Sequence, residues 1–599
     1  MENIFAERVE AIRTLMRERG WDAVILTGSD PHTSEYPARR WKQVEWVSGF
    51  TGEAGDLVIT LDHAGLWTDT RYFIQANKQL AGTGIELHKM RVPEQVPIPQ
   101  WLAGRGFKAP VVAVDGLCQT VAAMDALQAA FDIPVKIVSV PDLLSPMWKN
   151  RPAIPCTPII TLGEDLTGSS REEKIHWLRK WMVMQGVDAI LLTALDEIAW
   201  LMNARGSDVE YNPVIISWLL VSLDRVEWFV RKDAFQEPDE ETLSSFEEIR
   251  SDGIEIKDYD EVDFALSTLV ENGVDKIYVD PSTLNIHLRE IIDPSVSVVS
   301  GLSPVPLRKS VKNPVEIEGM REAHLEDGLA VEKFLYWLEG HIGEVDEWQA
   351  ACKLQSFRAE IPGYRGDSFE TISAYGPGAA LPHYVTPRSG APVLEPHGLY
   401  LCDSGGQYLF GTTDITRTVP LGPCTALEKE DYTLVMKCHI DLAMAVFPQG
   451  TAGCQLDILA RNALWQSKRN FGHGTGHGVG FYLNVHEGPQ EFRQNFNAYP
   501  FVPGIINTIE PGLYREGMHG VRHENVILVR EDGTNDFGTW YAFETLTLCH
   551  YDTSVLVREL MTPEEIAWLN AYNERVYRTL SPRLPAEIAT WLRQKTLPL

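Results

Sequence analysis

The pattern of hydrophobic and polar residues in the N-terminal region occurs twice along the chain. In the first copy, apolar residues at helical spacing predict a helix over residues 7–19, and Gly20 ends this helix. The apolar run over residues 21–27 then predicts a buried strand. The apolar residues of the helix are Val9, Ile12, Leu15 and Met16. A helix, a glycine and a strand in this order are typical of αβ domains.

The same order returns with a helix over residues 174–185, Gly186 and an apolar run over residues 187–193. Both copies share the residues Gly-x-Asp-Ala at the start of the strand. Each copy continues with two strands joined by a turn, predicted at 56–60 and 64–67 and at 214–221 and 226–230. We therefore predict two related αβ domains of about 150 residues each, although a chance match between two common αβ units is the alternative.

Two proline-containing stretches, residues 151–158 and 304–314, predict linkers between domains. Ser169 and Ser170 precede two glutamates and predict the start of the second repeated helix. A long helix is expected over residues 315–339, and we interpret the acidic stretch 237–248 as a solvated helix face. The expected domains are residues 1–155, 156–311 and 312–599, the last with a short helical extension over residues 581–599.

Charge and composition exclude several classes of function. Lys and Arg number 53 and Asp and Glu number 83, so the formal charge is 53 − 83 = −30. This charge disfavours nucleic-acid and anionic-membrane partners, because like charges repel. No apolar run approaches about 18 residues, and the charged N-terminal segment is not typical of a signal peptide. The eight cysteines include no CxxC pair, so we expect free thiols and a cytoplasmic protein.

Two aspartates lie on neighbouring predicted strands in the C-terminal half. The apolar run 399–402 ends at Asp403, and Asp414 lies within residues 411–419, which alternate like a strand. A hairpin centred on residues 408–409 would place the two carboxylates opposite each other. Opposed carboxylates repel unless a cation lies between them, and a hard divalent ion is the natural partner. Two solvated turn aspartates are the alternative.

A glycine-rich segment, residues 471–480, contains His473 and His477. Its four glycines between residues 472 and 478 exclude a stable helix, because each costs about 1 kcal/mol there. We therefore expect a loop whose backbone approaches another group closely. The segment lacks the phosphate-loop pattern, so a phosphate site is not indicated. His486 follows, just before a predicted turn, and three histidines so close together favour a functional site over an isolated structural histidine.

Two glutamates adjoin apolar strands further along the chain. Glu510 ends the run 505–509 and precedes a Pro-Gly turn, while Glu524 precedes the run 525–529. If they are buried, a metal ion or Arg522 has to neutralise them, because an unpaired buried carboxylate is costly. Solvated strand ends are the alternative.

The candidate ligands together comprise four carboxylates, one imidazole and no cysteine. Oxygen-rich ligation suits Mn²⁺ or a related divalent ion better than a structural zinc. Four carboxylates carry a charge of about −4, which two divalent cations balance. The sequence therefore predicts a two-metal site formed by Asp403, Asp414, His477, Glu510 and Glu524.

Several motifs resemble those of the pita-bread-fold metallopeptidases. They are Asp-Ser-Gly-Gly-Gln-Tyr, Gly-Thr-Thr-Asp-Ile-Thr-Arg-Thr, His-Gly-Thr-Gly-His-Gly-Val-Gly, Glu-Pro-Gly and Arg-His-Glu-Asn-Val. Within this group the whole chain resembles the long, three-domain Xaa-Pro aminopeptidases, the aminopeptidase P family. The resemblance implies a fold of mixed α/β and α+β class: two related creatinase-N-like αβ domains followed by a pita-bread catalytic domain.

The resemblance also implies a role for each candidate residue. Asp403 would bind one metal, Asp414 and Glu524 would bridge both, and His477 and Glu510 would bind the other. The catalytic positions that it implies are His383, His473, His486, Glu510 and Arg522. Mn²⁺ is the expected metal, with Zn²⁺ and Co²⁺ as alternatives.

The activity implied by the resemblance is hydrolysis of the N-terminal Xaa-Pro bond of peptides by a metal-activated water. The expected partners are peptides with proline at the second position and a second copy of the chain, in a cytoplasmic homodimer without nucleic acid or membrane. The alternatives are a prolidase that cleaves Xaa-Pro dipeptides, a creatinase-like hydrolase without metal, and a non-enzymatic pita-bread binding module. Two N-terminal domains disfavour the prolidase, and the intact ligand set disfavours the other two.

Overall fold

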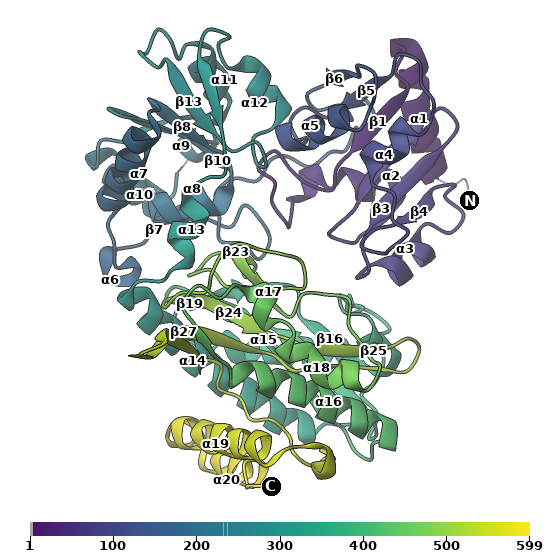
Figure 1. The fold of residues 1–599 in the computed structure, drawn as a ribbon, viewed down its shortest axis with the longest axis vertical. Helices are drawn as coiled ribbons and strands as arrows, with labels where there is room; N and C mark the ends of the chain where they lie inside the picture. The colour runs from purple at the N-terminus through teal and green to yellow at the C-terminus, as the bar shows by residue number, and fades with distance from the viewer. Residues whose placement is uncertain (1–3, 232, 237) are drawn as a thin grey trace. The chain divides into compact units, whose positions relative to one another are not determined.

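The computed structural model describes residues 4–231, 233–236 and 238–599 (Figure 1). The chain divides into two compact units. The first comprises residues up to Gly163 together with Ser169–Val305, and the second comprises Glu164–Gly168 together with Pro306–Leu599.

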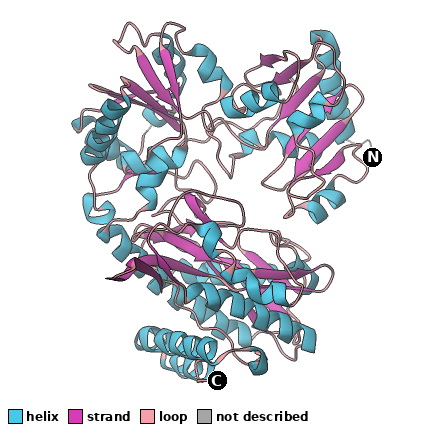
Figure 2. Cartoon of the chain, viewed as in Figure 1, coloured by secondary structure: helices cyan, strands magenta, loops and turns pink. Residues whose placement is uncertain are grey.

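The first unit contains two six-stranded sheets, each covered by helices (Figure 2). The first sheet has the strand order β4-β3-β2-β1-β5-β6. Its central strand β1 pairs antiparallel with β2 and parallel with β5. The strands are β1 (Ala23–Leu26), β2 (Asp56–Thr60), β3 (Ala64–Thr68), β4 (Glu86–Lys89), β5 (Val111–Val114) and β6 (Lys136–Ser139).

The second sheet repeats this design with the strand order β12-β11-β10-β8-β13-β14. Its central strand β8 pairs antiparallel with β10 and parallel with β13, as β1 does with its neighbours. The strands are β8 (Ala189–Leu192), β10 (Ser217–Ser222), β11 (Val226–Val230), β12 (Glu255–Asp258), β13 (Lys276–Val279) and β14 (Ser297–Ser300). The repeated sequence pattern is therefore confirmed as a repeated fold.

Two glycines end the repeated helices in the same way. Gly20 follows α1 (Ile4–Arg19) with a φ of 68°, and Gly186 follows α7 (Arg171–Gln185) with a φ of 67°. L side chains rarely adopt this left-handed conformation, so glycine is favoured at both positions. The two predicted helix ends are confirmed.

The second repeat also contains the predicted helix start and the acidic stretch. Ser170 caps α7, because its hydroxyl accepts a hydrogen bond from the N–H of Glu173 and its own N–H donates to the Glu173 carboxylate. Within the acidic stretch 237–248, residue 237 lies outside the described residues. The later part forms α10 (Glu240–Ser251), which confirms a helix there.

The linker regions contain more structure than their prolines predict. Residues 151–158 have neither helix nor strand, as expected, but residues 304–314 contain the short helix α13 (Val305–Ser310). The long helix follows as α14 (Pro314–Glu339). Its proline lies in the first turn, where no backbone hydrogen bond is lost, so it begins the helix and does not interrupt it.

The second unit packs one six-stranded sheet and several smaller sheets against long helices (Figure 2). The six-stranded sheet has the order β21-β28-β27-β24-β22-β23, and a three-stranded sheet has the order β16-β17-β20. Five strands of these two sheets end beside the candidate site residues: β17 (Leu399–Ser404), β20 (Ile415–Pro420), β22 (Gly476–Gly478), β24 (Ile506–Ile509) and β27 (Asn525–Asn535).

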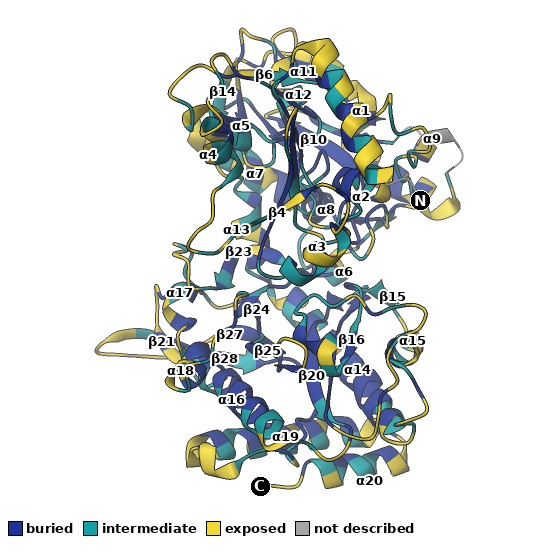
Figure 3. Cartoon of the chain, turned by 90° about the vertical axis from the view of Figure 1, so that its right-hand side faces the viewer, coloured by how far each residue is buried: buried dark blue, intermediate teal, exposed yellow. Residues whose placement is uncertain are grey.

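The buried helix α16 (Ala426–Ala443) organises the core of the second unit. It contacts α18 (Leu459–Gln466) and the C-terminal helix α19 (Pro563–Leu580), and α20 (Ala586–Lys595) follows. Figure 3 shows the strands of this unit mostly buried, while the outer faces of the terminal helices include exposed residues. The helical C-terminal region thus begins at Pro563 and not at the predicted residue 581. The apolar face of α19 packs into the core.

Among the described residues, no helix combines the length and apolar character needed to cross a bilayer. All eight cysteines are free thiols.

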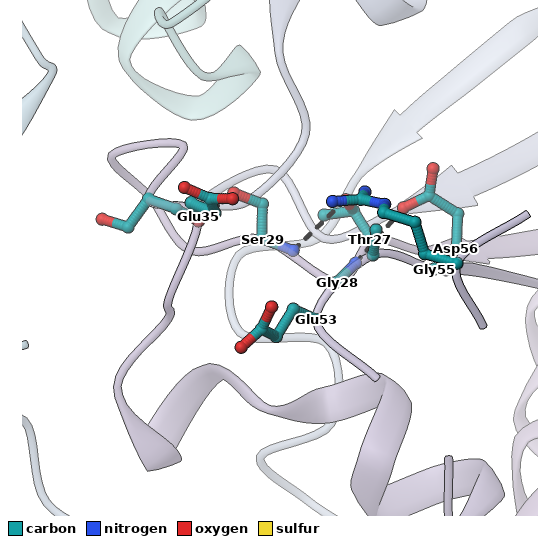
Figure 4. A pocket seen from close by; sticks show the side chains of 10 residues that line it. Thr27, Gly28, Ser29, Glu35, Glu53, Gly55 and Asp56 are labelled. Atoms are coloured by element: carbon teal, nitrogen blue, oxygen red, sulfur yellow. Dashed lines mark hydrogen bonds between the residues drawn. The ribbon is translucent and has the colours of Figure 1, made fainter. Parts of the chain in front are cut away.

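A pocket of about 290 Å³ lies at the end of β1 in the first unit (Figure 4). Carboxylates, hydroxyls and one guanidinium line it, and the Asp56 carboxylate accepts a hydrogen bond from the N–H of Gly28 at 3.2 Å. None of the candidate site residues lies in its lining, which comprises Thr27, Gly28, Ser29, Ser34, Glu35, Glu53, Ala54, Gly55, Asp56 and Arg71.

Candidate metal centre

Asp403 and Asp414 lie on neighbouring strands but not directly opposite each other. Asp403 is on β17 and pairs in register with Thr416, while Asp414 immediately precedes β20. The hairpin turn falls at residues 409–410, so the predicted centre at 408–409 was wrong by one residue.

Gly405 accounts for the change in register. β17 ends at Ser404, and the chain continues as β18 (Gly406–Tyr408) in a different sheet. A Cβ at position 405 would lie 2.0 Å from the carbonyl oxygen of Thr413, so only glycine allows this close approach. The two aspartates still lie close enough to interact, and the charge of Asp414 therefore raises the pKa of Asp403.

His477 lies in the three-residue strand β22, so the glycine-rich segment is only partly the predicted loop. A Cβ at Gly476 would lie 1.9 Å from the carbonyl oxygen of Thr508 in β24. The N–H of His477 donates to the Thr508 hydroxyl at 3.0 Å. Gly476 therefore lets β22 lie against β24, and this contact fixes the backbone that carries the imidazole of His477.

Glu510 and Glu524 lie at strand ends, as predicted. The N–H of Glu510, after β24, donates to the carbonyl of Thr475 at 2.7 Å. The N–H of Glu524, before β27, donates to the carbonyl of Thr416 at 3.1 Å, and the Thr416 hydroxyl donates to Oε2 of Glu524 at 2.8 Å. The bonds between Thr416 and Glu524 join the ends of the two sheets, and the bond to Thr475 fixes the backbone of Glu510 within the six-stranded sheet.

The side chains of Asp414, His477 and Glu524 converge. Each offers one potential ligand atom, and these atoms lie within 4.8 Å of one another. Nε2 of His477 also lies 3.8 Å from Oε1 of Glu510 and 3.5 Å from Oδ2 of Asp414. Four of the five predicted ligands therefore lie close enough together to share one metal centre.

The hydrogen bonds of His477 indicate which ring nitrogen carries the proton. Nδ1 lies 2.8 Å from the carbonyl oxygen of Gly478, which can only accept, so Nδ1 carries the hydrogen. In the neutral ring Nε2 then presents a lone pair to the carboxylates of Asp414 and Glu510. Such a group faces carboxylates favourably when a proton or a cation lies between them, and a shared cation gives the arrangement of a metal ligand.

Arg522 forms its ion pair with Asp403, and its charge also lowers the pKa of Glu510, so it partly offsets the charge of one of the two glutamates. Its Nε and Nη2 lie 3.1 and 2.5 Å from Oδ2 of Asp403. Oδ1 of Asp403 is buried and has no hydrogen-bond partner among the residues that the structure describes. This buried oxygen therefore keeps a lone pair available to a cation.

Burial and mutual repulsion raise the pKa values of the clustered carboxyl groups. Burial raises the pKa of Asp403, which Arg522 opposes and Asp414 increases. Burial also raises the pKa of Glu510 to about 7 and that of Glu524 well above its usual range, and the charges of both aspartates add to these increases. Carboxylates in such a cluster either take up protons or bind cations.

The donor set fits two divalent cations. Four carboxylates and the guanidinium of Arg522 carry a charge of −4 + 1 = −3, which exceeds the charge of one divalent ion. Oxygen atoms form most of the donor set, and oxygen ligands favour hard ions.

Tyr514 is a site residue that the sequence did not indicate. Its hydroxyl donates to Nε2 of His473 at 2.8 Å and accepts from Nη1 of Arg522 at 2.7 Å. Nδ1 of His473 faces the carbonyl of Gly474 at 2.6 Å, which assigns the hydrogen of this ring to Nδ1. Burial lowers the pKa of His473 to about 3, so this ring is neutral near pH 7. A continuous network therefore joins His473 to Asp403.

His486 and His383 lie at the same site. The ring of His486 packs edge-on against that of His477, with centroids 4.3 Å apart and planes at 89°. His486 precedes strand β23 (Glu487–Phe492), so the predicted turn there was wrong. His383 is half-buried in the loop after the 3₁₀ helix η3 (Gly376–Ala380), close enough to His473 to contribute to the lowered pKa of that ring.

Glu347 holds the loop that carries His383. Its Oε1 accepts the N–H of Tyr375 at 2.6 Å, and its Oε2 accepts the hydroxyl of Tyr384 at 2.8 Å. Glu347 is fully buried at the start of α15 (Glu347–Arg358), and burial raises its pKa to about 7. Nothing in the sequence distinguishes it from other acidic residues in a first helical turn.

The convergence of buried carboxylates and one imidazole at the ends of two sheets is typical of a carboxylate-rich metallohydrolase. Models of known families match consecutive parts of the chain. Metallopeptidase family M24 matches residues 318–531, and the C-terminal region of this peptidase matches residues 539–599. Two descriptions of the creatinase/prolidase N-terminal domain match residues 8–147 and 150–316.

Full-length relatives agree with these matches. The chain is 36% identical over 670 residues to aminopeptidase P1 of Lotus japonicus, with 100% of both chains covered. It is 38% identical over 611 residues to a probable Xaa-Pro aminopeptidase P of Verticillium alfalfae, with 99% of each covered. The protein therefore belongs to metallopeptidase family M24, with two creatinase-like N-terminal domains before a pita-bread catalytic domain.

Solved structures give the same result. The X-prolyl aminopeptidase of Caenorhabditis elegans, described as a cytosolic enzyme with a di-nuclear active site, has a TM-score of 0.93 at 33% identity. That comparison covers 99% of this chain and 100% of the other. The Xaa-Pro dipeptidase of Bacillus anthracis has a TM-score of 0.51 at 26% identity, and that comparison covers 63% of this chain and 98% of the dipeptidase chain.

Proposed function

We propose that this peptidase removes the N-terminal residue from peptides whose second residue is proline. The observation that carries the proposal is the lone pair of His477 Nε2 facing Asp414 and Glu510, because this is how an imidazole ligand and carboxylate ligands are arranged around a cation. The full-length relatives named aminopeptidase P1 and Xaa-Pro aminopeptidase P support an aminopeptidase with this specificity.

The proposed ligand roles are those that the family resemblance implies. Asp414 and Glu524 would be shared by two cations, His477 and Glu510 would hold one of them, and Asp403 would hold the other. The convergence of Asp414, His477 and Glu524 and the buried Oδ1 of Asp403 support these roles. Mn²⁺ is the proposed metal because the donors are mostly oxygen, with Zn²⁺ and Co²⁺ as alternatives.

These residues would hold two divalent cations, which would supply an activated water molecule and polarise the scissile carbonyl group. Glu510 accepts the proton of the attacking water as a general base. His486 or His383 donates a hydrogen bond to the substrate carbonyl oxygen. The carboxylates hold the free α-amino group of the substrate, which restricts cleavage to the N-terminal bond.

Arg522 and His473 support these groups. Arg522 holds Oδ2 of Asp403 with two N–H groups, which leaves Oδ1 for a cation. His473 stays neutral and, through Tyr514, holds the guanidinium in place.

The proline at the second position of the substrate has to be recognised by its shape. An Xaa-Pro bond is a tertiary amide without an N–H, so the enzyme cannot recognise it through an acceptor for that donor. Apolar contacts to the pyrrolidine ring have to supply the specificity. The proposed specificity for proline therefore rests on the relatives named Xaa-Pro aminopeptidase P.

The proposal also includes the organisation of the protein. The three domains are residues 1–155, 156–311 and 312–599, which the separate sheets and the ranges of the family matches support. We further propose a cytoplasmic homodimer. Free cysteines and the cytosolic relative from Caenorhabditis elegans support the location.

Peptide hydrolysis tests the function directly. The purified protein is incubated with Arg-Pro-Pro and with an Xaa-Pro dipeptide, each with Mn²⁺ and with a chelator. We expect release of arginine from the tripeptide, loss of activity with the chelator and recovery with added Mn²⁺. Cleavage of the dipeptide alone would indicate a prolidase, and activity that ignores the chelator would contradict the metal-dependent mechanism.

A further inference from the structure

A second cluster of potential ligands lies at the edge of the first sheet. His63 is in the turn between β2 and β3, while Glu86 and His88 are on the edge strand β4. Glu86 and His88 are two residues apart on a strand, so their side chains point to the same face. One atom from each of the three side chains lies within 4.8 Å of the others.

The spacing of the two imidazoles suits a shared metal ion. Nε2 of His63 lies 3.1 Å from Nε2 of His88. Two nitrogens bound tetrahedrally to one Zn²⁺ at about 2.05 Å lie about 3.3 Å apart. Oε2 of Glu86 lies 3.9 Å from Nδ1 of His63, and its side chain is 73% exposed, so the carboxylate can rotate toward a shared ion.

Gly65 provides the space in which the two rings meet. It lies opposite Glu86 in the parallel pairing of β3 and β4. A Cβ at this position would lie 2.7 Å from Nε2 of His88 and 2.8 Å from Nε2 of His63. Its φ is not in the left-handed region, so the need for glycine here is space and not backbone conformation.

Two tryptophans fix the rings from the sides. The ring of Trp67 stacks on His88, with centroids 3.8 Å apart and planes at 7°, and Trp101 packs against His63 at 4.8 Å. Burial among these groups lowers the pKa values of both imidazoles. Both rings are therefore neutral near pH 7, which is the form that binds a metal.

We propose that His63, His88 and Glu86 form a third metal site, which binds Zn²⁺. Two imidazoles and one carboxylate are a donor set of zinc, whereas the four-carboxylate centre of the second unit favours harder ions. Three protein ligands leave the fourth position of the tetrahedron to water. The site does not depend on the proposed peptidase function, because none of its residues belongs to the catalytic unit.

Zinc stoichiometry tests this site without an activity assay. The full-length protein carrying Asp414→Asn, which weakens the carboxylate centre, is titrated with Zn²⁺ by isothermal titration calorimetry. We expect His63→Gln and His88→Gln in this background to bind one equivalent fewer, or to bind that equivalent at least about 100-fold more weakly. The matched control is His176→Gln, an exposed histidine of α7, which should keep the equivalent.

Gly65→Ala tests the geometry without removing a ligand. The added methyl group should displace both imidazoles, so the same zinc equivalent should be lost. Circular dichroism checks the fold of every variant, and the two glutamine variants decide the question if Gly65→Ala does not fold. Equal zinc binding by the parent and by the folded glutamine variants would overturn the proposal and leave the pair as a hydrogen bond between two neutral histidines.

Discussion

Nε2 of His477, in strand β22, lies 3.5 Å from Oδ2 of Asp414, which immediately precedes strand β20 of another sheet. The distance exceeds that of an ordinary hydrogen bond, and the ring hydrogen is already directed at the carbonyl of Gly478. A cation between them would account for both facts. In the proposed metal centre, residues at the ends of two sheets therefore supply the ligands.

Removing either of these two side chains should abolish peptidase activity. His477→Ala and Asp414→Ala each delete a metal donor, so kcat/KM for Arg-Pro-Pro should fall by more than about 100-fold, since even groups that only orient ligands contribute 10–100-fold. Bound metal, measured by elemental analysis, should fall in parallel. His176→Ala, which removes an exposed imidazole, should behave as wild type. Near-normal turnover by either site variant would refute the ligand assignment.

The hydroxyl of Tyr514 should matter for activity although it binds no metal. Tyr514→Phe removes the group that joins His473 to Arg522, so the guanidinium that holds Asp403 loses one partner. We expect kcat/KM and metal affinity to fall by about 10–100-fold without loss of fold. Tyr336→Phe, at a ring that packs on Trp591, is the matched control. Unchanged metal affinity in Tyr514→Phe would exclude this role.

Glu347 should act on catalysis through the loop that carries His383. Glu347→Ala deletes both acceptors that hold Tyr375 and Tyr384, so we expect kcat to fall by about 10–100-fold with a smaller change in KM. Glu347→Gln keeps acceptor capacity and should lose less. The exposed Glu344→Ala is the control. Equal kinetics for the alanine and glutamine variants would argue against positioning by these hydrogen bonds.

A rise in pH should destabilise the metal-free protein and increase the stabilisation that a bound metal provides. Burial raises the pKa of Glu510 from its ordinary 4.5 to about 7, so the folded metal-free protein binds this proton more tightly than the unfolded chain does. That stabilisation is complete below pH 4.5 and is lost as the pH rises toward 7. Cations bind the deprotonated carboxylates, so stabilisation by Mn²⁺ should grow over the same range.

Thermal unfolding at pH 5, 6 and 7 measures this effect, with a chelator and with Mn²⁺. The difference in Tm between the two conditions should increase with pH. The increase should be smaller in Glu510→Gln, which cannot lose a proton. A difference in Tm that is constant with pH would show that the carboxyl protons are not exchanged for cations.

Local patterns were sufficient to predict the repeated fold and the candidate ligands. The helix, glycine and strand of each repeat are short segments whose periodicity and turn chemistry act locally. Glu510 and Glu524 stand out because a carboxylate adjoins an apolar strand, and the structure brings both to the cluster around His477.

Contacts between distant segments could not be predicted in the same way. The hairpin register depends on how Gly405 passes the carbonyl of Thr413, which no pattern in the sequence records. Tyr514 and Glu347 look like ordinary strand and helix residues, and their roles come from partners far along the chain. The pairing of Arg522 with Asp403 was missed for the same reason, because only the fold brings the two residues together.

Anomalous diffraction from crystals grown with Mn²⁺ tests the central claim most directly. The account predicts two anomalous peaks about 3.5–4 Å apart, both within bonding distance of side chains from the set Asp403, Asp414, His477, Glu510 and Glu524. A map with no peak at this cluster, or with the five side chains apart and solvated, would contradict it.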